Sequence, residues 1–358
     1  MVTNAIANLE AIGKGFSFKF LGQPANYDIN QRLIEYNSQS SHLRAMQVGI
    51  LNTLLVAIAG VILATILGFI LGVLRLSKNW LTNKIAHVYI EYIRNVPVLL
   101  HILLVHGLMV HSLPKPKQAI TVGDGGFLTN RGLFMPKPLP ENLMWVVIAL
   151  FFAGIVFAFI FRRWAKKVQD ATGKIYPVFW ISLFAIIVVP AIAYFALGQP
   201  VNWDTPELKG FNFKGGMVIR PEFIALWLAL SFYTAAFIAE VIRGGLQAVP
   251  KGQTEAADAM GLKYGPAMRL IVLPQALKIS IPGIVNTFIG LYKDSVLVIV
   301  IGLLDPLGIG QASLADAKWQ GLSTEVYLFV AVFFFISCFA MARYSLHLEN
   351  KLHTGHKR

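Results

Sequence analysis

The stretch Met46–Leu74, MQVGILNTLLVAIAGVILATILGFILGVL, decides the fold class. It carries no charged side chain from its first residue to its last. A bilayer core of about 30 Å needs roughly 20 apolar residues in a helix. Buried helices of water-soluble proteins rarely extend that far without a charge. The stretch therefore predicts a membrane-spanning helix.

Further apolar runs follow on its C-terminal side. Together with this first run they give seven predicted spans, at 48–74, 88–111, 143–161, 178–197, 222–242, 279–302 and 326–342. Of the 358 residues, 56% are hydrophobic and only 14% are charged, and the mean hydropathy is +0.62. This composition excludes a water-soluble globular protein. We predict an all-α integral membrane protein with about seven transmembrane helices.

The basic residues predict the orientation, because loops rich in lysine and arginine resist translocation. The segments 75–87, 162–177, 243–278 and 343–358 hold 17 of them in 81 residues. The alternate segments, 1–47, 112–142, 198–221 and 303–325, hold 12 in 125 residues. The first set and the C-terminus are therefore predicted to be cytoplasmic. The net charge of +13 is dispersed among these short segments, which argues against nucleic-acid binding.

Local composition also predicts how the chain is divided into parts. Two loops rich in proline and glycine bracket the third and fourth spans, which indicates an inserted helix pair. The predicted parts are a polar outer or interfacial arm (1–45), two core helices (46–111), outer loops with the inserted pair (112–221), the remaining core helices (222–345) and a basic cytoplasmic tail (346–358). Within the fourth part, a cytoplasmic loop covers 244–278.

That loop contains a spaced pattern: Glu255-Ala256-Ala257, three residues, Gly261, nine residues, then Ile-Val-Leu-Pro274. The helix formers between 254 and 260 predict a short exposed helix. We expect Gly252 and Thr254 to begin it and Gly261 to end it in the left-handed conformation.

The spacing resembles the EAA signature of ABC importer permeases. The resemblance implies that the short helix is a coupling helix that fits a groove of an ATPase subunit, with Glu255, Ala256, Ala257 and Gly261 as the matching positions. Pro274 is expected to start the next helix. The alternative is an ordinary amphipathic loop helix.

Three other segments indicate which group of ABC importer permeases the chain resembles. These segments are 235–253, 291–297 and Tyr92–Pro97. They resemble polar amino-acid permeases of the histidine and glutamine type, and the arm and inserted pair look most like the larger permease of general L-amino-acid uptake systems. The resemblance implies a type I core of five helices, and another spanning helix upstream of residue 1. It also implies a location in the bacterial inner membrane.

The same resemblance implies the partners. These are a second homologous permease subunit in a heterodimer, two ATPase subunits, a periplasmic amino-acid-binding protein and an L-amino acid as cargo. ATP and magnesium would bind to the partner ATPase, with no cofactor in this chain. The sequence lacks a GxxxxGK[ST] phosphate loop, which agrees with hydrolysis on a partner.

Charged residues within the predicted spans are candidate functional residues, because an uncompensated charge there costs at least about 2.5 kcal/mol. Lys293 and Asp294 either line the translocation path or pair with other helices. The candidates for the path also include Asn95 and Arg94, whose guanidinium can instead reach toward lipid phosphate. Glu240 and Arg243 are one turn apart and are predicted to brace the coupling loop.

Two other classes of function compete with the permease. An ion-coupled secondary transporter that uses Lys293 and Asp294 without an ATPase would leave the pattern from Glu255 to Pro274 unexplained. A membrane enzyme lacks support, because the sequence shows no nucleophile and base set. Cys338 is the single cysteine and no Cys/His spacing predicts a metal site.

Overall fold

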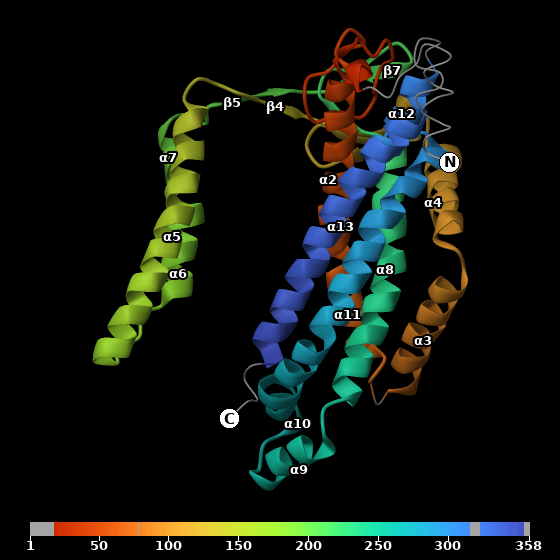
Figure 1. The fold of residues 1–358 in the computed structure, drawn as a ribbon. Helices are drawn as coiled ribbons and strands as arrows, with labels where there is room; N and C mark the ends of the chain where they lie inside the picture. The colour runs from red at the N-terminus through yellow and green to blue at the C-terminus, as the bar shows by residue number, and fades with distance from the viewer. Residues whose placement is uncertain (1–17, 78, 316–322, 354–358) are drawn as a thin grey trace. The chain divides into compact units, whose positions relative to one another are not determined.

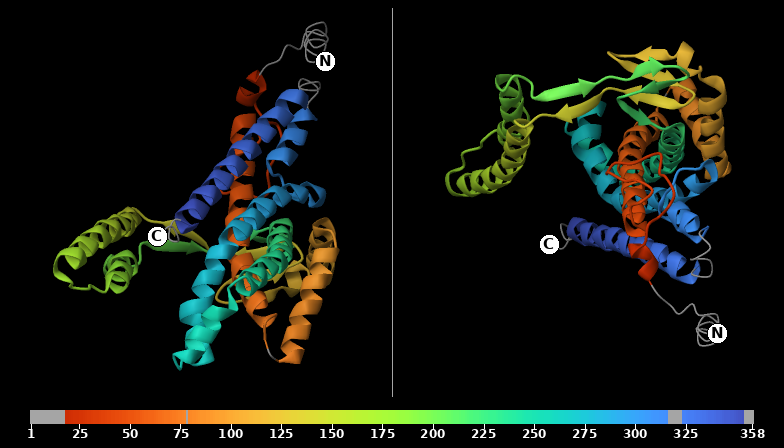
Figure 2. Two further views of the ribbon diagram at one scale, coloured as in Figure 1. Left: turned by 60° about the horizontal axis from the view of Figure 1, so that its bottom comes forward. Right: turned by 90° about the horizontal axis from the view of Figure 1, so that it is seen from above.

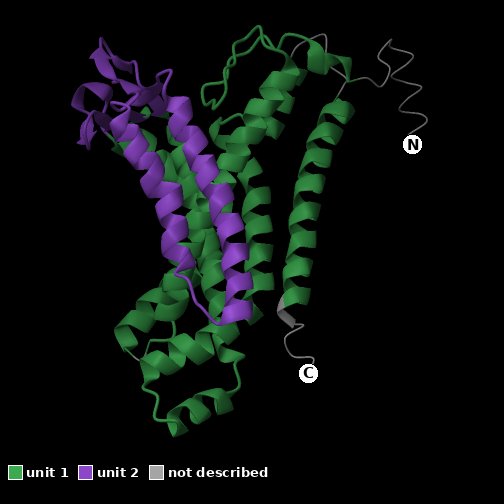
Figure 3. Ribbon diagram, turned by 90° about the vertical axis from the view of Figure 1, so that its left-hand side faces the viewer, with its two compact units in different colours: residues 1–113, 130–132, 219–358 green, residues 114–129, 133–218 purple. Residues whose placement is uncertain are grey.

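The computed structural model describes residues 18–77, 79–315 and 323–353 (Figure 1). The start of the predicted arm (1–17) and the end of the predicted tail (354–358) lie outside the described residues. The chain forms two compact units (Figure 3). Unit 1 comprises 1–113, 130–132 and 219–358, and unit 2 comprises 114–129 and 133–218.

Unit 1 is helical. Its elements are the 3-10 turn η1 (Lys19–Gly22), α2 (His42–Leu74), α3 (Trp80–Asn95), α4 (Val98–Ser112), α8 (Pro221–Gln247), α9 (Lys251–Ala259), α10 (Tyr264–Ala267), the π-helical turn η4 (Met268–Val272), α11 (Leu273–Asp294), the 3-10 segment η5 (Ser295–Ile301), α12 (Pro306–Leu314) and α13 (Ser323–His353).

The described residues include six helices long and apolar enough to cross a membrane, and a bent pair, α3 with α4, that makes a seventh span if counted as one. Each of the seven predicted runs lies within one of these spans or extends beyond it by a single residue. The predicted class, a helical membrane protein with about seven spans, is therefore confirmed.

Helix α8 lies at the centre of unit 1, where it packs against α2, α3, α4 and α11 (Figures 1 and 2). The C-terminal end of α13 lies beside the middle of α11, since Tyr344 and Leu348 share a cavity lining with Ile281 and Val285. Helices α9 and α10 lie at this same end, and α12 lies at the other (Figure 1). The segments of unit 1 predicted to be cytoplasmic are thus together.

Helices α2 and α8 approach each other closely because glycine faces α8. A methyl group on Gly68 would lie 2.6 Å from Cβ of Ile238 and 2.9 Å from the carbonyl oxygen of Ala235. One turn on, a methyl on Gly72 would lie 3.0 Å from the carbonyl oxygen of Ala239. Small residues at such spacing let two backbones pack in contact within a membrane. Gly68 and Gly72 therefore pack α2 against α8.

The second predicted span is broken rather than continuous. Helices α3 and α4 meet at an angle of 105°, and α3 begins at Trp80, eight residues before the predicted run. Pro97 explains the break, because its ring restricts the preceding residue to extended backbone. Val96 accordingly has φ −109° and ψ 131°.

Pro274 lies in the first turn of α11, as predicted, but α11 continues directly from the preceding helical turn instead of starting after a break. Helical structure runs without interruption from Tyr264 to Ile301, and Pro274 lies within it. The π-helical turn Met268–Val272 comes directly before α11. A proline in a helix clashes with the carbonyl four residues back, here that of Leu270. This carbonyl belongs to the wider π turn, which accommodates the ring.

The described part of the arm packs onto the helices. Phe20, Ile29 and Tyr36 are buried, and the last two belong to a hydrophobic cluster with Met46 of α2 and Ile309 of α12. The Tyr36 hydroxyl donates to the carbonyl of Tyr27 at 2.8 Å. The arm is therefore a folded layer over one end of unit 1 in residues 18–41. Its polar composition conceals the few apolar side chains that fix it.

Helix α12 was not predicted from the sequence. It begins at Pro306 with Asp305 as its N-cap, whose Oδ1 accepts a hydrogen bond from the Gly308 amide at 2.7 Å. The Asp305 side chain is 2% exposed. Burial raises the pKa of Asp305 to about 6, and the hydrogen bond from Gly308 offsets part of this rise.

Unit 2 combines a helical hairpin with short strands. The hairpin consists of α5 (Met144–Thr172), α6 (Val178–Leu183), the π turn η3 (Phe184–Val188) and α7 (Val189–Ala196). The strands are β1 (Ile120–Val122), β2 (Gly126–Thr129), β3 (Gly132–Met135), β4 (Lys137–Pro140), β5 (Val201–Asp204), β6 (Glu207–Lys209), β7 (Asn212–Lys214) and β8 (Met217–Ile219). A 3-10 turn, η2 (Pro116–Gln118), precedes β1.

The strands form three small sheets, in the orders β1-β2-β3-β8, β4-β5 and β6-β7. Strand β1 pairs with β2 in antiparallel register, with Ile120 opposite Leu128. Phe127 stacks on Phe213 with 4.5 Å between ring centroids, and Phe134 lies against the same ring. These sheets, in loops expected to lack regular structure, are an addition to the predicted all-α fold.

We predict that Gly68→Ala lowers the thermal unfolding midpoint of the purified protein. The added methyl overlaps Ile238, and overpacking of this kind costs about 1–3 kcal/mol. Gly244→Ala is the control, because a methyl there meets no atom within 4 Å and alanine is the better helix former. Equal midpoints for the two variants would contradict close α2–α8 packing.

We predict that Asp305 makes stability depend on pH. The folded state keeps the proton up to about pH 6, whereas the unfolded chain releases it near 3.8. Stability therefore falls as pH rises from about 4 to about 6, by on the order of 3 kcal/mol, and is level above that. Asp305→Asn keeps the capping oxygen and should flatten this part of the unfolding profile. An unchanged slope in the variant would assign the dependence to another group.

Candidate functional site

The candidate coupling helix exists as α9, between the end of α8 and the start of α10. It begins at Lys251 after Pro250, without a side-chain cap, so the expectation that Gly252 and Thr254 begin the helix is wrong. Pro250 has φ −57° and ψ 135°, and this extended backbone separates α9 from α8. Proline supplies the boundary that a capping side chain supplies elsewhere.

Gly261 ends α9 as predicted, in the left-handed conformation with φ +76°. Its amide donates to the carbonyl of Asp258 at 2.9 Å, and the Leu262 amide donates to the carbonyl of Ala257 at 3.1 Å. These two bonds form a Schellman motif. A side chain at Gly261 would meet no atom within 4 Å, so the requirement for glycine is conformational rather than steric.

One face of α9 is attached to the rest of unit 1. Ala257 is fully buried, and α9 packs against α10 and η4. Gln275 of α11 donates a hydrogen bond from Nε2 to Oε1 of Gln253 at 3.2 Å. Just before the start of α9, Val249 lies in a cluster with Val272 and Ala276. The helix is therefore held by both α8 and the α10–α11 run.

Residues on the other side of α9 and just after it are exposed in the isolated chain. Glu255 and Ala256 are exposed, and so are Met260 and Tyr264 beside them, at 69% and 64%. Two large side chains at that exposure, next to a small alanine, form an apolar surface suited to a protein partner. The sequence interpretation missed Met260 and Tyr264. The sequence feature that could have identified them is the presence of apolar residues on both sides of Gly261 in an otherwise polar loop.

The structure brings together Glu240, Arg243 and Arg94. The Arg243 Nη2 atom is 2.8 Å from Oε2 of Glu240, and its Nε atom lies 3.0 Å from the same oxygen. Arg243 Nη1 also donates to Gln247 at 2.7 Å. Arg94, from α3, lies 4.0 Å from Glu240 and over the ring of Phe237. The ion pair expected one turn apart on α8 is present, and it extends to a second helix.

Asn95 does not join this group. Its Nδ2 atom donates to the carbonyl of Glu91 at 2.7 Å, and the side chain stays on the surface of α3. Of the two residues proposed at the start of the second span, only Arg94 thus reaches another predicted site residue.

Lys293 and Asp294 lie where α11 changes into the 3-10 segment η5, rather than in the middle of a uniform helix. Lys293 is exposed and Asp294 is half-buried. Among the described residues neither side chain forms an ion pair or a hydrogen bond. A change of helix type within a span marks a place where the helix bends readily. Two charges at such a place are available to another subunit or to a cargo.

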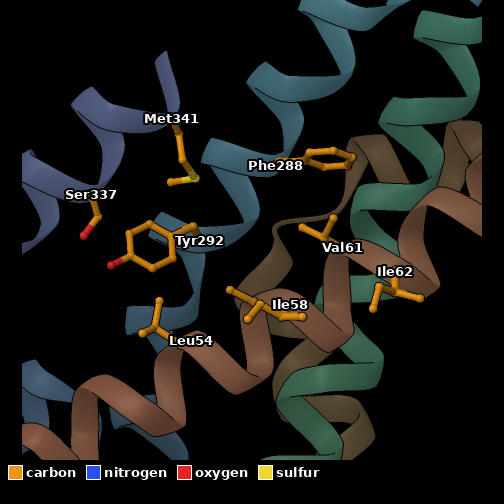
Figure 4. A pocket seen from close by; sticks show the side chains of 9 residues that line it. Leu54, Ile58, Val61, Ile62, Phe288, Tyr292, Ser337 and Met341 are labelled. Carbon is orange, nitrogen blue, oxygen red and sulfur yellow. The ribbon is translucent and has the colours of Figure 1, made fainter. Parts of the chain in front are cut away.

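The helices of unit 1 also form an open apolar pocket of about 370 Å³ (Figure 4). Ile58 and Val61 of α2, Phe288 and Tyr292 of α11, and Met341 of α13 are among its lining residues. It offers almost no polar surface, so it does not suit a zwitterionic cargo. The described residues also contain no group of three or more metal ligands.

We predict unequal effects from removing Glu240, the carboxylate shared by the network, and from removing the charge of Arg94. Glu240→Ala leaves Arg243, whose side chain is 29% exposed, without its carboxylate, and should cost about 1–3 kcal/mol of stability. Arg94→Gln removes a contact of 4.0 Å from a side chain that is 41% exposed, and should cost under about 1 kcal/mol. Thermal unfolding of both variants measures this. A larger loss for Arg94→Gln would reverse the ranking of the two contacts.

Comparison with known proteins gives consistent matches. The family model described as "Binding-protein-dependent transport system inner membrane component" matches residues 151–353. The general L-amino acid transport system permease protein AapQ of Rhizobium johnstonii is 43% identical over 307 residues, which cover 86% of this chain and 77% of AapQ.

Two relatives come from Rhodobacter capsulatus, both named as permease proteins of a glutamate/glutamine/aspartate/asparagine transport system. BztB is 40% identical and the match covers 86% of this chain and 79% of BztB. BztC is 56% identical over 131 residues, 36% of this chain and 30% of BztC.

A crystal structure of an amino acid ABC transporter with histidines shares the fold. It has a TM-score of 0.52 and 20% identity, and the match covers 87% of this chain and 95% of that one. The family match covers more than half of the chain, and AapQ matches most of it. This chain therefore belongs to the family of binding-protein-dependent transport system inner membrane components, which are multi-pass permease subunits of ABC transporters and not enzymes.

Proposed function

We propose that this chain is the permease subunit of an ATP-driven importer that moves L-amino acids across the inner membrane by alternating access. The observation that carries the proposal is α9, a capped helix with one face buried against α10 and η4 and one face exposed. Such a helix can transmit movement from an ATPase partner to the spans. Glu255, Ala256, Ala257 and Gly261 are the residues proposed to couple it.

The contacts around α9 give a route for that movement. Its attached face holds η4 and α11 through Ala257 and through the bond between Gln253 and Gln275. Helix α11 is tied to α8 where the Ser280 hydroxyl donates to the carbonyl of Val241 at 3.2 Å. A displacement of α9 therefore reaches both α8 and α11. Proline at 274, next to the π turn, provides a place for the run to bend.

The pair of Glu240 and Arg243 braces this route on the α8 side. It lies one to two turns before the end of α8, with Arg243 also bound to Gln247. We assign Lys293 and Asp294 to the translocation path, because they lie unpaired among the described residues at the change of helix type. Arg94 belongs with the brace rather than with the path.

The partners follow from the same proposal. Relatives BztB and BztC carry the name of one transport system, which supports pairing of this chain with a second homologous permease in a heterodimer. Two ATPase subunits would bind ATP and magnesium, and this chain would hold no cofactor. A periplasmic binding protein would deliver the amino acid. The end of unit 1 with α9 and the C-terminus would face the cytoplasm.

The test is ATP-dependent uptake in proteoliposomes that contain this chain with its partner permease, ATPase and binding protein. Gly261→Val should reduce uptake at least tenfold, because valine is strained at φ +76° and the helix end unwinds. Glu255→Lys should do the same by reversing the charge of the exposed face.

Gly252→Val is the matched control, since a side chain there also meets no atom within 4 Å but its backbone is in the ordinary helical region. It should retain uptake. Uptake that survives both Gly261→Val and Glu255→Lys would disprove coupling through α9. Uptake that needs no ATP would identify an ion-coupled transporter instead.

A further inference from the structure

A second, polar cavity lies away from α9, at the opposite end of α8. It has a volume of about 60 Å³. Its lining comes from three segments: the arm, the start of α8 and the loop between η5 and α12. The lining residues are Ile29, Asn30, Gln31, Arg220, Glu222 and Gly302–Leu304.

The arm is fixed to this cavity by hydrogen bonds. The Arg220 amide donates to Oε1 of Gln31 at 3.3 Å, and Nδ2 of Asn52 in α2 donates to the carbonyl of Gln31 at 2.7 Å. Gln31 is only 8% exposed. The cavity is therefore formed by ordered segments that hold each other in place, rather than by a surface loop.

Polar atoms beside the cavity lack partners. The Nε atom of Arg220 is buried and has no hydrogen-bond partner among the described residues, and the same holds for Oδ1 of Asn52, whose residue is 1% exposed. Buried polar atoms in folded proteins are nearly always satisfied by protein, water or a ligand. Arg220 lines the cavity, so its unsatisfied Nε donor indicates that a polar species occupies it.

The charges at the cavity identify the class of that species. Arg220 and Glu222 both line it, yet neither takes part in an ion pair among the described residues. Glu222 lies in the first turn of α8. A guanidinium is suited to a carboxylate, and a carboxylate is suited to an ammonium group. A ligand with both groups on neighbouring atoms matches the two together.

We propose that this cavity binds the charged head group of an amino acid, with Arg220 at the α-carboxylate and Glu222 at the α-ammonium. The proposal rests on the proposed function, because it takes the cargo to be an amino acid. A volume of about 60 Å³ equals about two waters. It admits the head group that all amino acids share and leaves the side chain outside. The site therefore receives cargo without selecting among side chains.

The test measures amino-acid binding to the assembled permease and ATPase complex in nanodiscs, without the binding protein. L-Glutamine is the probe, with L-glutaminamide, which lacks the carboxylate, and N-acetyl-L-glutamine, which lacks the ammonium. Wild type should bind L-glutamine at least tenfold more tightly than either derivative. Arg220→Gln should abolish discrimination against the amide, and Glu222→Gln should abolish discrimination against the N-acetyl form.

Two further variants serve as controls for charge and for side-chain geometry. Glu35→Gln changes an exposed carboxylate of the arm and should behave as wild type. Arg220→Lys keeps the charge without the planar fork and should bind L-glutamine more weakly than wild type but more tightly than Arg220→Gln. These variants also show whether a loss of binding follows the charge or a loss of folding, which thermal unfolding checks directly.

The outcomes separate this proposal from the proposed function. Unchanged discrimination in Arg220→Gln and Glu222→Gln overturns the cavity assignment, as does absence of L-glutamine binding to wild type. In both cases intact ATP-dependent uptake by the full system leaves the importer in place. Absence of that uptake in wild type overturns the proposed function instead.

Discussion

The close contact between α2 and α8 is the constraint on which the rest of unit 1 depends. Within a bilayer there is little hydrophobic gain from bringing two helices together, so the association relies on close van der Waals packing. Gly68 and Gly72 provide it by letting the α2 backbone approach Ala235 and Ala239. With α8 fixed in this way, α3, α4 and α11 pack around its remaining faces.

Helix α8 connects the two regions to which we assign a role. At its first turn, Arg220 and Glu222 line the polar cavity beside the arm. Near its last turns, Glu240 and Arg243 form the ion-pair network, and Pro250 then separates it from α9. A helix that is packed along its length behaves as a rigid element. Movement imposed at the α9 end would therefore be felt at the cavity end, as alternating access requires.

The effect of a proline on a helix in this chain depends on the neighbouring backbone as well as on the proline ring. Pro97 breaks the second span, because it restricts Val96 to extended backbone between the two helices. Pro274 and Pro190 lie within continuous helical runs, each two residues after a π turn. The sequence marks all three positions in the same way. Pro282 lies inside α11 without a π turn directly before it, so a proline in the sequence does not by itself decide whether a helix ends or continues.

The sequence was informative wherever the signal is local. Apolar runs predicted the spans, and Gly261 predicted the end of α9, since a left-handed residue after a helix favours glycine in any context. The arm was harder, because its polar residues hide the buried side chains of Phe20, Ile29 and Tyr36. Helix α12 and the small sheets were missed, because short elements are stabilised by contacts with distant segments.

The sequence by itself determined that this protein spans a membrane about seven times, which family it resembles and where the exposed helix α9 ends. These properties follow from hydrophobic length and from the conformational preference of single residues. The tertiary structure alone decided that Arg94 meets Glu240, and that Gln31, Arg220 and Glu222 surround one cavity. Those contacts join residues far apart in the chain, so they exist only once the helices have packed.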